Sequence, residues 1–308
     1  MDPSTQPSCT ESLFFTPGER RLRSGFRLLG QLILLAVFAF CILGALAAIF
    51  YFNTELPGFA YSLLPQAASI FAITLSVFLA RRWLDRRTFV SLGLSLDARA
   101  GWDLLVGFGI AGLMMTLIFL IEWSVGWLTF QGFVGHGASL LPVAAGVFLL
   151  FMAVSWGEEL LYRGYWLQNL EEGTNLFWGV LLSSLVFALG HLANPNASLT
   201  AIVGLVASGI FLAYGYTSTR QLWLPMGLHT GWNFFEGTVF GFPVSGLGDF
   251  PRIIDQAVNG PARITGGLFG PEAGLVLLPA LLLGVGLVYL YTRRRPKPGI
   301  SPTGVNIP

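Results

Sequence analysis

The sequence predicts an all-α bundle of about eight transmembrane helices with both termini on the cytoplasmic side. Of its 308 residues, 54% are hydrophobic and only 11% are charged, and the mean hydropathy is +0.68. A soluble domain carries about 25% charged residues, so this chain has too little polar surface to stay in water. The apolar residues gather in runs of about 20, the length a helix needs to cross ~30 Å of hydrocarbon. These observations predict an integral membrane protein.

Eight apolar runs have a length suited to transmembrane helices. The first follows a group of arginines and is too long for the apolar part of a signal peptide, which predicts an uncleaved membrane anchor. The runs cover residues 28–52, 59–80, 104–130, 139–156, 176–193, 199–217, 222–242 and 273–291.

The basic residues are distributed unevenly about these runs. With the N-terminus inside, 15 of the 17 lysines and arginines fall in cytoplasmic segments, and only Arg252 and Arg263 fall outside. Cytoplasmic loops of membrane proteins are enriched in lysine and arginine. The pattern therefore predicts a multi-pass protein of the cell inner (plasma) membrane. Arginine outnumbers lysine heavily, which suggests a bacterial chain of high G+C content.

The runs divide the chain into segments of different character. A proline-containing polar tail, predicted to be disordered and cytoplasmic, comes first, and the loop after the seventh run is predicted to be extracytoplasmic, as a cap or a flap. The segments are the tail 1–27, helices 1–3 in 28–137, helices 4–7 in 138–242, the loop 243–271, helix 8 in 272–292 and a basic cytoplasmic tail 293–308.

Charge and cysteine content exclude several classes of function. The formal net charge is only +1, so no basic excess indicates a nucleic-acid partner, and the lipid bilayer is the expected surrounding. Cys9 and Cys41 are the only cysteines and form no C-x-x-C motif. Disulfide frameworks and iron–sulfur clusters are therefore excluded.

Charged side chains inside the predicted spans are few, and the first group ends the fourth run. Inserting such a group costs at least ~2.5 kcal/mol, so each one needs a partner or a function. Glu159 and Arg163 are four residues apart and can pair on one helix face. Glu158 points about 100° away from that face, which leaves its carboxylate available for chemistry.

Two of the three histidines also lie in or beside apolar runs. The fifth run contains His191, and the seventh contains His229 and Asn233, four residues apart, with Glu236 three residues further along that face. Alone, a buried histidine or a Glu–Arg pair is usually structural. Their occurrence together in a charge-poor chain favours a functional site.

These residue types suit the activation of water. A desolvated Glu158 can take a proton from water and pass it to a leaving amine, while His191 orients that water. His229 and Asn233 can donate together to the oxygen of a tetrahedral intermediate, and Glu236 could orient one of them. A zinc site formed by Glu158, His191 and His229 is an alternative by ligand type, but the sequence lacks His-Glu-x-x-His spacing.

Together the three motifs resemble a known family. Glu-Glu-x-x-x-Arg at 158–163, Phe-x-x-x-His at 187–191 and His-x-x-x-Asn at 229–233 are similar to the motifs of the CAAX protease and bacteriocin-processing (CPBP, or Abi) family of intramembrane endopeptidases. The resemblance covers about residues 140–242 and marks 138–242 as the catalytic core. It implies a type II CAAX prenyl endopeptidase-like protease in which Glu158 is the base, His191 its partner, His229 and Asn233 the oxyanion pair, with support from Glu159 and Arg163.

The resemblance leaves the substrate and the mechanism open. Eukaryotic members remove the last three residues of prenylated C-a-a-X proteins, whereas bacterial members resemble peptide-processing and immunity proteins. A membrane peptide or protein substrate is therefore expected. We favour a metal-independent glutamate peptidase, with a metalloprotease, the family's older label, as the alternative. A proton-coupled transporter and a non-catalytic scaffold are the competing functions.

Straight spans do not bring the motifs together. Ideal helices place Glu158 near the cytoplasmic side and His191 nearer the outer face, so the two could not meet. The sequence from Leu160 to Leu170 is compatible with a helix. We therefore predict that the fourth helix continues past Arg163, with a water-filled cavity that opens to the cytoplasm.

Overall fold

The computed structural model describes residues 14–16, 19, 21–52, 58–134, 140–248 and 250–295. Within them the chain is helical, apart from one pair of strands, β1 (Leu128–Phe133) and β2 (Ile254–Val258). The α-helices are α2 (Ser24–Phe52), α3 (Gly58–Leu79), α4 (Ala98–Ser124), α5 (Leu140–Glu159), α6 (Gln168–Gly173), α7 (Leu176–Leu189), α8 (Leu199–Thr219), α9 (Trp223–Asn233), α10 (Ala262–Thr265) and α11 (Leu277–Thr292). The π-helices are η2 (Ala80–Leu84), η4 (Leu160–Leu167) and η5 (Phe234–Val239), and the 3₁₀-helices are η3 (Phe89–Leu92), η6 (Gly267–Phe269) and η7 (Pro271–Ala273).

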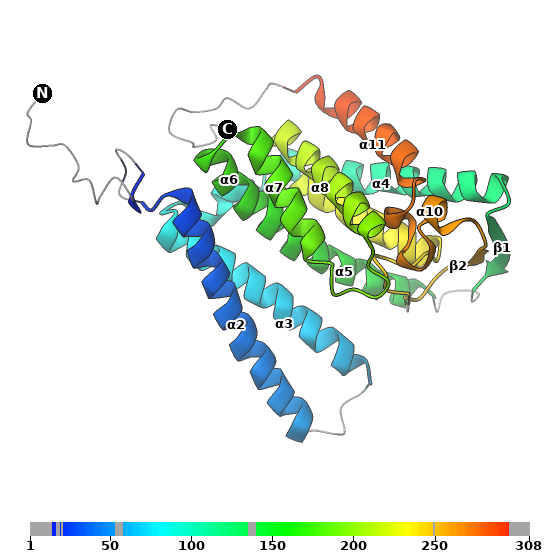
Figure 1. The fold of residues 1–308 in the computed structure, drawn as a ribbon, viewed down its shortest axis with the longest axis horizontal. Coiled ribbons are helices and arrows are strands. Elements are labelled where there is room, and N and C mark those ends of the chain that lie inside the picture. The colour runs from blue at the N-terminus through cyan, green and yellow to red at the C-terminus, as the bar shows by residue number, and fades with distance from the viewer. Residues whose placement is uncertain are drawn as a thin grey trace, which may run out of the picture.

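The all-α class is confirmed, and each of the eight predicted runs overlaps a helix. Five helical segments in the described part of the chain are long and apolar enough to cross a membrane, and α7 and α11 are shorter apolar helices. The five are Ser24–Phe52, Leu63–Leu84, Ala98–Ser124, Leu141–Gly173 and Leu199–Thr219. The chain is thus a multi-pass membrane protein. Figure 1 shows the α2–α3 hairpin extending away from the remaining helices, which pack together.

The third and first predicted segments differ from the structure at their ends. Helix α4 ends at Ser124, where the third run was expected to continue to residue 130, because Gly126 adopts a positive φ of 75° that ends the helix. The residues that follow form β1, which pairs antiparallel with β2 of the 243–271 loop. The first run differs at its N-terminal end, because α2 already begins at Ser24, within the predicted tail. Residues 1–13 and 296–308 lie outside the described residues.

Helix α9 lies inside the bundle, and its residues from Leu224 to Asn233 are all buried. Two glycines, Gly227 and Gly231, face α4, where a Cβ on Gly231 would lie 2.7 Å from the Phe108 carbonyl oxygen. Small residues four apart let two helices approach until their backbones touch. Because side chains two positions away point to the opposite side, His229 is directed away from α4, toward α5.

An ionic cluster joins the start of α2, the end of η2 and α6. The buried carboxylate of Asp85 lies 3.2 Å from Arg27 and 2.7 Å from Arg81. At the same end, Arg220 pairs with Glu171 at 2.7 Å. This arginine-rich end includes residues that the charge pattern places on the cytoplasmic side.

Candidate active site

A long helix carries the first motif. Segments α5, η4 and α6 are continuous from Leu140 to Gly173, which confirms that the fourth helix extends beyond Arg163. Glu158 lies 15 residues before Gly173, and His191 lies 15 residues after Leu176, the first residue of α7. At 1.5 Å per residue both are about 22 Å from the connecting turn, so the two side chains reach the same level.

The four predicted catalytic residues line one cavity of about 350 Å³. Glu158 comes from α5, His191 from the turn after α7, and His229 and Asn233 from α9. The rest of the wall is mainly apolar and includes residues of α3, α5 and the loop after η5: Leu63, Leu150, Phe151, Val154, Val244, Leu247 and Phe250. Sequence reasoning therefore brought together residues that do share one site.

Both histidines direct the same ring atom at Glu158. Nε2 of His191 lies 4.0 Å from Oε2 of Glu158, and Nε2 of His229 lies 3.8 Å from the same oxygen. These separations are longer than a direct hydrogen bond and suit a bridging water. The Glu158 side chain is 23% exposed and lines the cavity, while Oε2 itself is buried and has no hydrogen-bond partner among the described residues.

Each histidine is held by its other ring nitrogen. Nδ1 of His191 is 2.9 Å from the carbonyl oxygen of Phe187, one turn earlier in the chain, which accepts its proton. Nδ1 of His229 is 2.9 Å from Oε1 of Glu159. A hydrogen bond at one nitrogen fixes the orientation of the ring, so Nε2 of both residues faces the cavity.

Glu159 and Arg163 form the predicted ion pair behind the cavity. Nη1 of Arg163 donates to Oε1 of Glu159 at 2.8 Å, and neither side chain is exposed. Nη2 donates to the carbonyl oxygen of Gly209 in α8 at 3.1 Å, and the guanidinium lies 4.5 Å from the ring centre of Phe187. Glu159 thus links α5 to α8, through Arg163, and to α9, through His229. That link to His229 was not predicted.

Glu236 was expected to orient His229 or Asn233, from the turn that follows them. It is fully buried on η5, but no hydrogen bond between described residues joins it to His229 or Asn233, and it does not line the cavity. Glu159 already occupies Nδ1 of His229. The role of Glu236 in orienting His229 or Asn233 stays a prediction.

Several polar residues of the cavity were missed by the sequence analysis, among them Asn194, Ser245 and Glu272. Asn194 follows His191 by three residues, while Ser245 and Glu272 come from the segment between η5 and α11. Nothing local marks Ser245 or Glu272, because both belong to irregular loop structure. Glu272 belongs to the predicted eighth helix by number, yet α11 begins only at Leu277.

The site residues do not form a ready-made metal site. Within the described residues, no group of three His, Cys, Asp or Glu side chains is arranged so that it could hold a metal ion. Nδ1 of His229 is engaged by Glu159, and the two Nε2 atoms stand about as far from Glu158 as a bridging water requires. We derive no step through a metal.

The cavity lies toward the end of the bundle opposite to the arginine-rich end. Helix α7 starts beside α6, whose Glu171 pairs with Arg220, and runs away from that end to reach His191. The predicted cytoplasmic position of the arginines and the predicted cytoplasmic opening of the cavity therefore cannot both hold.

Comparison with known proteins agrees with the motif analysis. Residues 140–235 match the family model described as "Type II CAAX prenyl endopeptidase Rce1-like". The resemblance to the CPBP family is confirmed. The chain is also similar to "Putative membrane peptidase YdiL" of Bacillus subtilis (strain 168), with 30% identity over 112 residues, which are 36% of this chain and 41% of that protein. The Rce1-like segment includes Glu158, His191 and His229 and ends two residues after Asn233.

Proposed function

We propose that this protein is an intramembrane endopeptidase that hydrolyses a peptide bond of a membrane-associated substrate with water activated by Glu158. The observation that carries the proposal is the convergence of two histidine Nε2 atoms on one carboxylate oxygen inside a cavity. The similarity to membrane peptidases supports it.

In the first step Glu158 accepts a proton from water as the oxygen attacks the carbonyl carbon. His191 holds that water, because its Nε2 lies 4.0 Å from the Glu158 oxygen and its ring is fixed by Phe187. A positioned general base contributes about 10²–10⁴-fold to a rate. The carboxylate needs no metal for this step.

His229 and Asn233 then stabilise the oxyanion of the tetrahedral intermediate. Nδ1 of His229 donates to Glu159, so Nε2 can donate to the oxyanion only when the ring carries both protons. Carboxylates stand near both ring nitrogens, Glu159 at 2.9 Å and Glu158 at 3.8 Å. Asn233, one turn later, supplies a second donor from the same face of α9.

The cavity wall indicates a substrate that is largely apolar. Leu63, Phe151 and Leu247 belong to three different segments and line the same cavity as the polar groups. A peptide segment with aliphatic side chains, with or without a prenyl group, would bury apolar area there.

Purified protein in detergent tests the proposal. Wild type, Glu158→Gln and Asp255→Asn would be assayed on a fluorescence-quenched prenylated C-a-a-X peptide and on a library of unprenylated membrane peptides, each with and without a zinc chelator. Asp255 is a matched control because it is half-exposed and lies away from the cavity. We expect cleavage by wild type and Asp255→Asn, with or without chelator, and a loss of about 10²-fold or more in Glu158→Gln. Chelator-sensitive cleavage would point to a metal enzyme, and absence of cleavage to a transporter or scaffold.

A further inference from the structure

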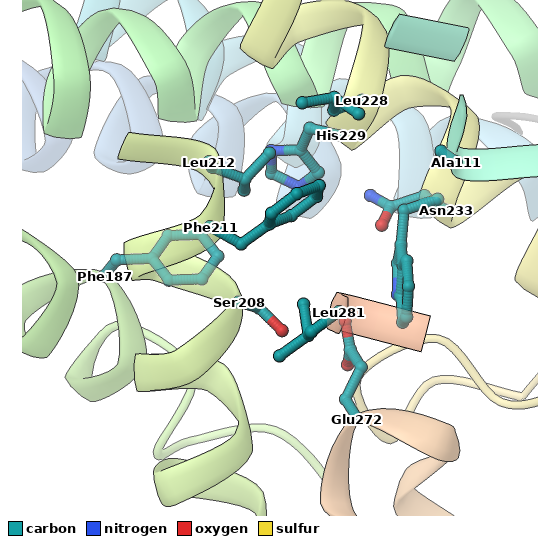
Figure 2. Close-up of a pocket in the computed structure, with 11 residues that line it drawn as sticks. Ala111, Phe187, Ser208, Phe211, Leu212, Leu228, His229, Asn233, Glu272 and Leu281 are labelled. Carbon is teal, nitrogen blue, oxygen red and sulfur yellow. The ribbon is translucent and has the colours of Figure 1, made fainter. Parts of the chain in front are cut away.

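Glu272 is a second carboxylate in the cavity, and the mechanism above does not use it. It is only 5% exposed and lies on η7, more than 100 residues from Glu158 in the sequence. It lines the 350 Å³ cavity together with Glu158 and also a neighbouring cavity of about 30 Å³. Figure 2 shows Glu272 pointing into the smaller cavity, with Ser208 beside it and His229 and Asn233 on the far side. A space of that size holds one or two waters.

The loop holds Glu272 in a fixed position. Oγ of Ser245 donates to Oε2 of Glu272 at 2.5 Å, and the carbonyl oxygen of Ser245 accepts from Nδ2 of Asn194 at 2.8 Å. Gly204 of α8 has no side chain, which lets the backbone oxygen of Glu272 approach the helix. These contacts tie the carboxylate to the turn that carries His191.

We propose that Glu272 is the general acid of the peptidase, the group that gives a proton to the leaving amine. The assignment rests on the function proposed above. Two carboxyl groups face one cavity from different environments, since Glu158 is partly exposed and Glu272 is buried. When two such groups share a site, the more exposed one serves as base and the more buried one retains a proton to donate.

The charges around Glu272 agree with this division. Burial raises the pKa of the Glu272 carboxyl above its ordinary value. The hydrogen bond from Ser245 and the histidines His191 and His229 oppose the shift but are weaker than burial. Glu272 is therefore protonated over more of the neutral pH range than an exposed glutamate.

The proton balance of the reaction closes with these two groups. Glu158 takes one proton from water as the C–O bond forms. When the C–N bond breaks, the nitrogen takes the proton of Glu272 and leaves as an amine. Glu158 then carries a proton and Glu272 has lost one, so a proton returns from Glu158 to Glu272 through cavity water before the next turnover.

The test compares an amide with a thioester at the same scissile position. An amine cannot leave without a proton, whereas a thiolate with a pKa of about 8.5 can. The probes are the best-cleaved peptide of the panel above and its thioester analogue, assayed with wild type, Glu272→Gln, Glu272→Asp and Glu158→Gln. We expect Glu272→Gln to lose about 10²-fold or more on the amide and less than about threefold on the thioester. Glu158→Gln should lose activity on both probes.

The pH profile of wild type gives a second, variant-independent readout. Loss of the second proton of His229 lowers cleavage of both probes as the pH rises, because Nε2 can then no longer donate to the oxyanion. Amide cleavage should show an additional decline through the pKa of Glu272, which thioester cleavage should lack. Equal losses on both probes in a folded Glu272→Gln, or the same alkaline decline for both probes in wild type, would overturn the assignment. Full amide activity in Glu272→Gln with loss in Glu158→Gln would reject only the role of Glu272. No cleavage of either probe by wild type would reject the peptidase and the acid together.

Discussion

Replacing Glu159 with glutamine should reduce both the stability and the activity of the protein, for two different reasons. Arg163 is completely buried, and Glu159 is its only carboxylate partner among the described residues. Removing one member of a buried ion pair strands the other charge and costs about 3–5 kcal/mol. The remaining contacts of Arg163, with the Gly209 carbonyl and the Phe187 ring, do not neutralise that charge.

A second substitution separates the two effects. Arg163→Met in the Glu159→Gln background removes the stranded guanidinium, and replacing a buried pair by apolar groups of similar volume is often neutral. We expect the double variant to recover to within about 1–2 kcal/mol of wild-type stability. The carboxylate that accepts from Nδ1 of His229 is still missing, so activity should remain about 10²–10⁴-fold low.

Denaturant unfolding in detergent and kcat/KM on a cleaved peptide would be measured for wild type, the single variant and the double variant. A single variant as stable as wild type would show that Glu159 and Arg163 do not form a tight buried pair. A double variant that regained activity together with stability would refute the role of Glu159 in orienting His229.

Three further results are expected. Asp85→Asn leaves two buried arginines without their shared carboxylate, so it should lower the free energy of unfolding by about 3–5 kcal/mol in denaturant unfolding. Asp255→Asn, at a half-exposed pair, should lower it by less than about 1 kcal/mol. Gly107→Ala should destabilise the protein by about 1–3 kcal/mol in thermal melts, because its Cβ would lie 2.5 Å from a carbonyl oxygen of α9. Gly109→Ala on the same helix meets open space, so it should be neutral or stabilising. A Leu247→Cys variant without native cysteines should react with a membrane-impermeant maleimide from outside intact cells, and labelling only in inverted vesicles would contradict this.

Local patterns predicted the parts of the site that depend on helix periodicity. Glu159 and Arg163, four residues apart, do form an ion pair, and His229 and Asn233, also four apart, do face one cavity. These relations follow from 3.6 residues per turn, so they are encoded within a few neighbouring positions.

Contacts between distant segments could not be predicted in this way. The bond between Glu159 and His229 spans 70 residues, and it depends on how α5 packs on α9. Glu272 reaches the cavity from a loop whose path is set by strand pairing and glycine contacts instead of hydropathy. The fourth apolar run stopped at residue 156 because charged residues follow, but pairing of Glu159 with Arg163 offsets their charges and allows the helix to continue.

The position of the cavity relative to the arginines bears on how a substrate arrives. Charge asymmetry predicts that the arginine-rich end is cytoplasmic, and α7 runs from that end toward His191. The loop that carries Ser245 and Glu272 lines the cavity at the end of the bundle opposite to the arginine-rich end. If the arginines are cytoplasmic, the scissile bond is reached from the outer half of the membrane, about 22 Å above the α6–α7 turn. A substrate would then be a transmembrane or exported peptide, because a cytoplasmic carboxy terminus would have to cross most of the bilayer to reach Glu158.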